Sequence, residues 1–230
     1  TMLICGCLNF LLPELPSSVK QPKTISEAII NPFKSFFVKD SIFVLLSIIF
    51  LYKLGDAFAG RLTTTFLLRG LEFSLTDVGA ISKGLGLMAS ILGGLYGGIL
   101  MYRLGLYRSL WIFAWLQALT NLGFFLLAIT GKSYIGLAVV IGLENLTGGM
   151  GTAAFVALLM AICDKSYTAT QFAMLTAFAS LGRILAGPPA GMLVNSYDWP
   201  IFFFLTFIIS LPVIFILQRY KNIVNRLDID

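Results

Sequence analysis

The sequence predicts an all-α protein that is a polytopic transmembrane six-helix bundle. Of the 230 residues, 58% are hydrophobic and only 12% are charged, with 20 Phe among them. This composition is too apolar for a soluble domain of ordinary makeup. The chain also contains six apolar stretches, each near the ~20 residues that a helix needs to cross the hydrocarbon of a bilayer. We therefore expect a protein that crosses the membrane six times.

The predicted spans follow one another through short connections. They are residues 41–68, 78–101, 109–129, 134–162, 170–194 and 199–217, which together make a bundle over residues 41–217. Residues 1–12 are apolar but too short to span, and they lack the basic segment of a secretory signal, so they suggest the end of a preceding transmembrane helix. Residues 13–40 hold four lysines and an Asn31-Pro32 breaker, which predicts a loop with room for an interfacial helix.

Basic residues outside the spans fall mainly on one side of the predicted bundle. Arg69 and Lys132 lie on the other side. The positive-inside rule then places residues 13–40 and the tail at residues 218–230 in the cytoplasm. The residues on the cytoplasmic side are Lys20, Lys23, Lys34, Lys39, Arg103, Arg108, Lys165, Arg219, Lys221 and Arg226.

Composition also excludes several functions. The net charge of +5 is spread through loops and forms no basic patch with interleaved aromatics, so nucleic acid is not an expected partner. The chain has no histidine, which removes imidazole catalysis, imidazole metal ligation and histidine proton relays. Cys5, Cys7 and Cys163 have no metal-binding spacing beyond one C-x-C. We expect no enzyme, no metal and no cofactor, and any proton-coupled step would have to use carboxylates.

Lys53 and Asp56 lie near the middle of the first span, where charged groups are costly and often mark a substrate or ion route. Being three residues apart, they share one face of a helix and can neutralise each other. Counting from Ser41 at 1.5 Å per residue, both lie roughly 18 to 22 Å deep, beyond the reach of snorkelling. The pair either fixes helix packing or handles substrate or protons.

Glu144 and Asn145 lie about ten residues into the fourth span, at a depth that matches Asp56. A desolvated carboxylate can take up and release a proton near neutral pH, whereas one paired with Lys or Arg stays charged. Glu144 is therefore the first candidate for proton coupling and Asp56 the second. An ion pair that only holds helices together would explain either residue as well.

Arg183 lies about thirteen residues into the fifth span and is followed by Gly187, Pro188 and Pro189. Prolines remove backbone donors, so this segment should kink or break the helix. Broken transport helices place free backbone groups beside a substrate. Arg183 could bind an anionic group with two hydrogen bonds, or it could offset the charge of Glu144.

Glycines are concentrated in the second and fourth spans. Their small-xxx-small spacing favours close helix packing. The alternative is gating by a mobile helix pair. The residues assigned to packing or gating are Gly94, Gly98, Gly148, Gly149, Gly187 and Pro188. The sequence has no G-x-x-x-x-G-K-[ST] motif of a phosphate-binding loop. The glycines concerned are Gly84, Gly86, Gly93, Gly94, Gly97, Gly98, Gly148, Gly149 and Gly151.

The turn between the second and third spans, residues 98–108 (GILMYRLGLYR), resembles a loop motif of major facilitator transporters, Gly-x-x-x-Asp-Arg-x-Gly-Arg-Arg. Gly98, Arg103, Gly105 and Arg108 match it approximately. Tyr102 replaces the acidic residue, so a charge lock against a neighbouring helix is not expected. Anchoring of the loop by the positive-inside rule suffices to explain the arginines.

Three segments resemble the C-terminal half of the AmpG-type muropeptide permeases, which are major facilitator transporters. They are residues 52–56 (YKLGD), residues 145–155 (NLTGGMGTAAF) and residues 169–173 (ATQFA) with the chain onward to Arg183. The resemblance covers residues 33–217, and residues 143–151 are its most specific part. Major facilitator transporters consist of two six-helix halves with the substrate site between them.

This resemblance implies a bacterial inner-membrane symporter that imports anhydromuropeptides, which are GlcNAc-anhydroMurNAc peptides, for peptidoglycan recycling and the beta-lactam response. The proton gradient would drive it, Arg183 or Lys53 would meet peptide carboxylates, and Glu144 or Asp56 would couple the proton. An N-terminal half would be needed, in the same chain or separate. The alternatives are another major facilitator transporter with an acetyl-CoA-like substrate, or a membrane interaction module that does not transport.

Overall fold

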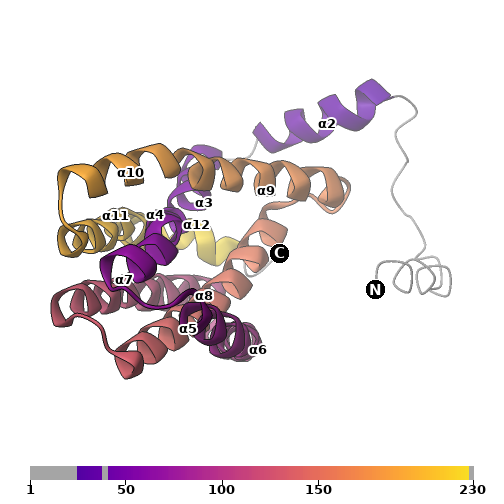
Figure 1. Cartoon of the computed structure of the whole chain (residues 1–230). Helices are drawn as coiled ribbons and strands as arrows, with labels where there is room; N and C mark the ends of the chain where they lie inside the picture. Colours follow the sequence, from indigo (N-terminus) through magenta and orange to yellow (C-terminus); the bar gives the residue numbers. More distant parts are fainter. Residues whose placement is uncertain (1–24, 38–40, 228–230) are drawn as a thin grey trace.

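Six helical spans, each long and apolar enough to cross a membrane, make up most of the computed structural model (Figure 1). The structure describes residues 25–37 and 41–227. No strand occurs among these residues, which confirms the all-α prediction. The predicted continuation of an earlier span at residues 1–12 lies outside the described residues and stays a prediction.

The spans lie at Ile42–Gly70, Leu75–Leu104, Leu106–Thr130, Tyr134–Ile162, Thr168–Ser196 and Trp199–Arg219. Each predicted span begins and ends within three residues of the corresponding observed span, so the six-span prediction is confirmed. Two short helices flank the bundle: α2 (Ile25–Phe37), in the loop where the sequence left room for one, and α12 (Lys221–Arg226), in the predicted tail.

Three of the six spans are not single α-helices. The first consists of α3 (Ile42–Tyr52), α4 (Leu54–Thr65) and the π-helical turn η1 (Phe66–Gly70), and the second of α5 (Leu75–Ala80), the π-helical turn η2 (Ile81–Leu85) and α6 (Gly86–Leu104). The fifth consists of α9 (Thr168–Leu185) and α10 (Gly187–Ser196). The other three are α7 (Leu106–Thr130), α8 (Tyr134–Ile162) and α11 (Trp199–Arg219).

The core of the bundle is divided into two apolar clusters along α7. One surrounds Leu110 and Phe113, and the other surrounds Phe124. The ring of Phe124 stacks on that of Phe203 in α11, with 5.2 Å between the ring centroids. Between them α7 carries two buried polar residues, Gln117 and Asn121. Because α7 packs against α8 on one side and α11 on the other, these polar side chains lie near the centre of the molecule.

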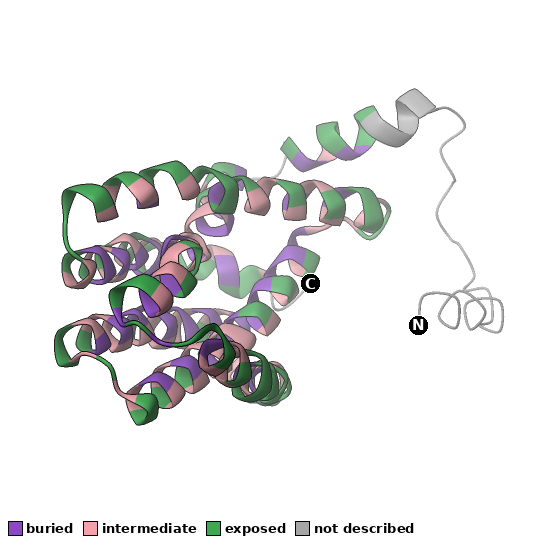
Figure 2. Ribbon diagram, viewed as in Figure 1, coloured by how far each residue is buried: buried purple, intermediate pink, exposed green. Residues whose placement is uncertain are grey.

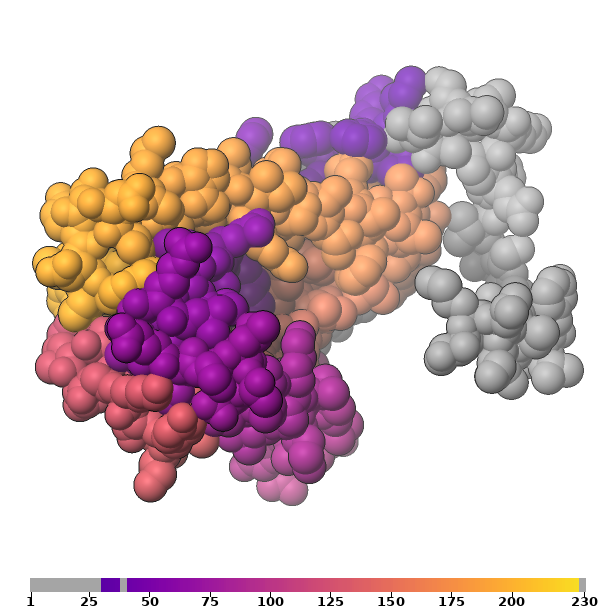
Figure 3. Space-filling model, viewed as in Figure 1, coloured from indigo at the N-terminus to yellow at the C-terminus, as the bar shows by residue number. Residues whose placement is uncertain are grey.

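The second and fifth spans lie at the outside of the bundle. Only 17% of the most apolar window of each is buried, against 39% to 44% for the other four spans. Figure 2 shows the correspondingly exposed faces of α6 and of α9–α10. In Figure 3, residues of α4 and α5 lie between the α9–α10 segment and the α6–α8 side of the molecule on the face shown. Two apolar helix faces are therefore without a partner among the described residues.

Glycines allow α6 and α8 to approach closely. A Cβ atom on Gly93 would overlap the carbonyl oxygen of Leu146, and one on Gly149 would overlap the carbonyl oxygen of Ser90. By contrast, a Cβ on Gly94, Gly98, Gly148 or Gly187 would meet no atom within 4 Å. A side chain at these four positions would therefore meet no described atom. Their predicted roles in helix packing or gating stay predictions.

This geometry predicts opposite effects for two adjacent substitutions in α6. Gly93→Ala should lower stability by about 1–3 kcal/mol, because the methyl group meets backbone that cannot rotate away. Gly94→Ala is the matched control: it has open space, and replacing a helical glycine by alanine should leave stability unchanged or raise it by roughly 0.5–1 kcal/mol. Melting of the two purified variants in detergent checks this, and equal melting temperatures would contradict the α6–α8 contact.

Candidate functional site

The first span breaks at Lys53, near its middle. Here α3 ends and α4 begins, with φ −104° and ψ 5° at Lys53. The next residue but one, Gly55, faces α11 so closely that a Cβ atom would overlap the Ser210 side chain. From the sequence, one continuous helix was expected here. Proline, the usual signal of a break, does not occur in this segment, so no local signal predicts the break.

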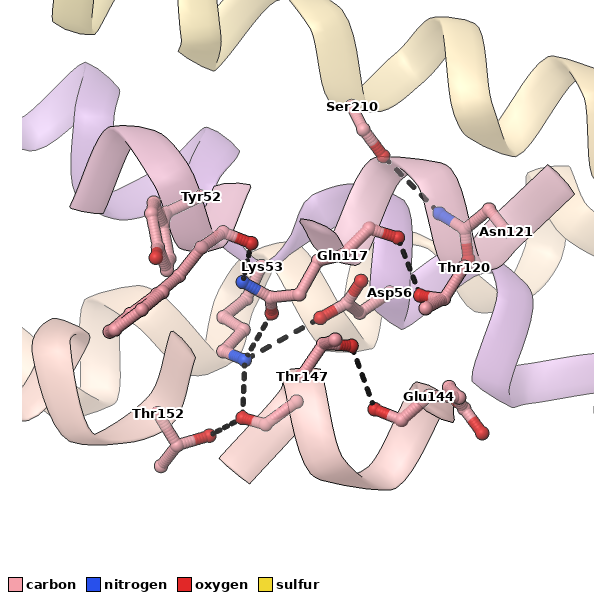
Figure 4. Close-up of polar contacts among 12 residues, drawn as sticks. Tyr52, Lys53, Asp56, Gln117, Thr120, Asn121, Glu144, Thr147, Thr152 and Ser210 are labelled. Carbon is pink, nitrogen blue, oxygen red and sulfur yellow. Dashed lines mark hydrogen bonds and ion pairs between the residues drawn. The ribbon is translucent and has the colours of Figure 1, made fainter. Parts of the chain in front are cut away.

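The Lys53 ammonium group joins three spans (Figure 4). It donates to Gln117 Oε1 of α7 at 2.7 Å, and it lies 3.5 Å from both Asp56 Oδ2 and the carbonyl oxygen of Gly148 in α8. Lys53 and Asp56 form an ion pair as the spacing of three residues predicted. Their side chains are 21% and 29% exposed, so the pair faces open space as well as protein.

Gln117 was missed by the sequence analysis, although it is the partner closest to Lys53. It is 4% exposed, and its Nε2 donates to the Phe113 carbonyl oxygen at 3.1 Å, which aims its Oε1 at the ammonium group. A Cβ atom on Gly151 would overlap the Gln117 amide, so α8 needs glycine at this point. An amide in the middle of an apolar span was the available signal, since buried polar groups need partners.

A polar cavity of about 610 Å³ opens beside this cluster. Lys53, Asp56, Glu144 and Asn145 all line it, so the structure brings together four of the five predicted substrate and proton residues. Its lining residues are Lys53, Asp56, Ser90, Gly94, Thr120, Glu144, Asn145, Gly148, Gly149, Thr152, Ala153 and Val156.

Glu144 and Asn145 differ in how they are held. Asn145 is fixed, because its Oδ1 accepts from Ser90 Oγ at 3.1 Å and its Nδ2 donates to the Ile141 carbonyl oxygen at 2.9 Å. The Glu144 carboxylate forms no ion pair with any described residue, and Figure 4 shows it pointing away from Lys53. In particular, Arg183 does not pair with it, so the predicted charge offset is not a direct contact.

A second cavity of about 390 Å³ adjoins the first and contains Arg183, the fifth predicted residue. The two share Lys53, Asp56 and Thr152. The predicted break follows Arg183, since α9 ends at Leu185 and α10 begins at Gly187. Arg61 of α4, which the sequence analysis did not single out, also lines this cavity, and it donates to the Arg183 carbonyl oxygen through Nη2 at 2.9 Å and Nε at 3.3 Å.

The predicted loop motif lies away from these cavities, at the end of the bundle where α6 meets α7. Arg103 is in the last turn of α6, and Arg108 is in the first turn of α7. Gly105 between them has φ 79°, a left-handed conformation that favours glycine, which gives this motif position a backbone reason. Over the part of the chain that the structure describes, no cluster of Cys, Asp and Glu could hold a metal ion.

Comparison with curated proteins identifies relatives of the whole bundle. The chain is 46% identical to the anhydromuropeptide permease of Escherichia coli K12 over 216 residues, which cover 94% of this chain and 44% of that protein. The chain belongs to the AmpG permease family. It is also 38% identical over 199 residues to the AmpG 4 transporter of Rickettsia felis, and 31% identical over 208 residues to the AmpG 1 transporter of Rickettsia prowazekii.

The chain spans about half the length of the curated relatives it matches, covering 44% to 48% of the three described above. No family model matches it. The names of these relatives indicate transporters rather than enzymes. The six spans agree with these names and indicate a multi-pass membrane protein.

Proposed function

We propose that this chain is the C-terminal half of a major facilitator permease that imports anhydromuropeptides across the bacterial inner membrane, driven by the proton gradient, for peptidoglycan recycling. The observation that carries the proposal is the polar cavity at mid-span, lined by one cation, two carboxylates and an amide inside an otherwise apolar bundle. Related permeases of the AmpG family supply the substrate class, since the E. coli relative is named for anhydromuropeptides.

The lining of the cavity suits a sugar-peptide substrate. Ser90, Thr120, Thr152 and Asn145 offer hydroxyl and amide groups, which can exchange hydrogen bonds with sugar hydroxyls and peptide amides. Lys53 and the neighbouring Arg183 offer charges for carboxylates. These groups line the cavities from five different spans, so a substrate bound here would contact most of the bundle at once.

An N-terminal half is the partner that this proposal requires. Exposed charges at the depth of Lys53 and Asp56 cannot face lipid, so protein or a water-filled cavity has to cover them. The exposed apolar faces of α6, with Leu87, Ile91 and Leu95, and of α9–α10, with Leu181 and Ile184, flank these cavities and give the second half surfaces to pack against.

The orientation follows from the distribution of charge. Six is an even number of spans, so the chain enters and leaves the bundle on the same side of the membrane, where Arg103, Arg108 and Lys165 also lie. Arg69 and Lys132 lie at the opposite end. By the positive-inside rule, α2 and the C-terminal α12 are cytoplasmic.

Proton coupling is assigned to Glu144 and Asp56 in different roles. Glu144 lines the cavity without a cationic partner among the described residues, so it can bind and release a proton without breaking an ion pair. Asp56 holds Lys53 at the break between α3 and α4. Protonation of Asp56 would loosen that contact and allow the two parts of the span to move, which links proton binding to a conformational change.

Uptake measurements test whether the chain is half of a permease. The chain is expressed in bacteria that lack their own muropeptide permease, with and without the N-terminal half of an AmpG relative, and uptake of labelled anhydromuropeptide is followed with and without a proton gradient. We expect gradient-dependent uptake only when both halves are present. No uptake despite insertion of both halves in the membrane would contradict the proposal.

Substitution of the two carboxylates separates transport from packing. In the two-half system, Asp56→Asn and Glu144→Gln should each abolish gradient-driven uptake, because neither amide can carry the proton, while the amount of protein in the membrane stays normal. Glu72→Gln is the matched control, since the Glu72 side chain lies outside both cavities and should tolerate the change. If the protein level falls in step with uptake, the carboxylates hold helices together and the interaction-module alternative gains support.

A further inference from the structure

We propose that Arg61 and Arg183 form a carboxylate-binding subsite at one end of the substrate cavity, and that Arg61 sets the preference for the charged form of the peptide. This inference rests on the proposed function, because the carboxylate is taken to belong to the transported muropeptide. Arg61 carries no role in the sequence analysis, and its place in the cavity emerges only from the folded arrangement.

Charge is unevenly distributed between the two adjoining cavities. The smaller one is lined by three cations, Lys53, Arg61 and Arg183, against the single carboxylate of Asp56, which is already paired with Lys53. No carboxylate of the described residues lies within 4.0 Å of either guanidinium group. Two arginines on one small cavity repel each other, and an anion bound between them would offset that repulsion.

Arg61 is held in place by the backbone of the opposite helix. It uses Nε and Nη2 to bind the Arg183 carbonyl oxygen, so the donors on Nη1 remain for a ligand. That carbonyl lies in the last turn of α9, two residues before this helix ends at Leu185. Because its planar group is oriented in advance, Arg61 would lose little freedom on binding a carboxylate.

The two cavities together match a ligand that is polar at one end and anionic at the other. The larger cavity offers hydroxyl and amide groups from Ser90, Thr120 and Asn145, and the smaller one offers the two guanidinium groups. They meet at Lys53, Asp56 and Thr152, so one elongated molecule can occupy both. In a muropeptide the sugars would lie in the first cavity and a peptide carboxylate in the second.

Paired substrates test this subsite in the two-half uptake system. Uptake is measured for labelled anhydromuropeptide and for the same molecule with its peptide carboxyl groups amidated. The unsubstituted protein should prefer the acid form, and Arg61→Gln should lower uptake of the acid form about tenfold, the effect of losing one charged hydrogen-bonding contact, while leaving uptake of the amidated form unchanged. Arg61→Lys should give an intermediate preference, because it keeps the charge but loses the planar donor pair.

Arg69→Gln is the matched control, since Arg69 lies at the end of the same span and lines neither cavity, and it should leave both uptake rates unchanged. An equal loss of uptake for the acid and the amidated substrate in Arg61→Gln and Arg61→Lys, at normal protein levels, would overturn the subsite while the proposed function stands. So would equal uptake of the two substrates by the unsubstituted protein. Absence of uptake of either substrate by the unsubstituted protein would instead overturn the proposed function itself.

Discussion

An ammonium group in the middle of a membrane bundle has to find its acceptors inside the protein, and much of this structure depends on how Lys53 does so. Burying such a charge at the bilayer centre costs at least about 2.5–3.5 kcal/mol on insertion scales. Lys53 offsets this with the Gln117 side chain, the Asp56 carboxylate and the Gly148 carbonyl oxygen. Since these acceptors lie on three spans, the position of one cation fixes the relative placement of α4, α7 and α8.

Close helix contacts make this arrangement possible. Gly55 lets α4 approach Ser210 of α11, and Gly151 leaves room for the Gln117 amide between α7 and α8. A larger residue at either position would push a helix outward and separate Lys53 from one of its acceptors. Lys53, Asp56 and Gly148 of this cluster also line the cavity, so the contacts that hold the bundle together present groups that a substrate and a proton would meet.

Local signals in the sequence predicted the spans, the Lys53–Asp56 pair and the break after Arg183. Each depends on short-range physics: hydropathy over ~20 residues, the spacing of neighbours on one helix face and the missing N–H of proline. The break at Lys53 was not predictable in this way, because it accompanies the contact of Gly55 with α11, which is distant in sequence.

The rotation of each helix about its own axis could not be predicted from local signals either. Gly93 packs against α8, whereas Gly94 beside it faces open space, and the sequence alone does not say which of the two turns inward. For the same reason the sequence did not single out Arg61, although the fold places it in the cavity with Arg183. Gln117 could have been found, since a lone amide in an apolar span needs a polar partner.

Lys53 and Gln117 act as one unit in this structure, and a double-mutant cycle on stability tests their coupling most directly. Melting in detergent is measured for Lys53→Met, Gln117→Leu and the combination. We expect Gln117→Leu alone to cost about 1–3 kcal/mol, because it leaves the ammonium group short of an acceptor, and to cost little once Lys53 is already Met. If the two losses simply add, Lys53 does not depend on Gln117 and the account of the site is wrong.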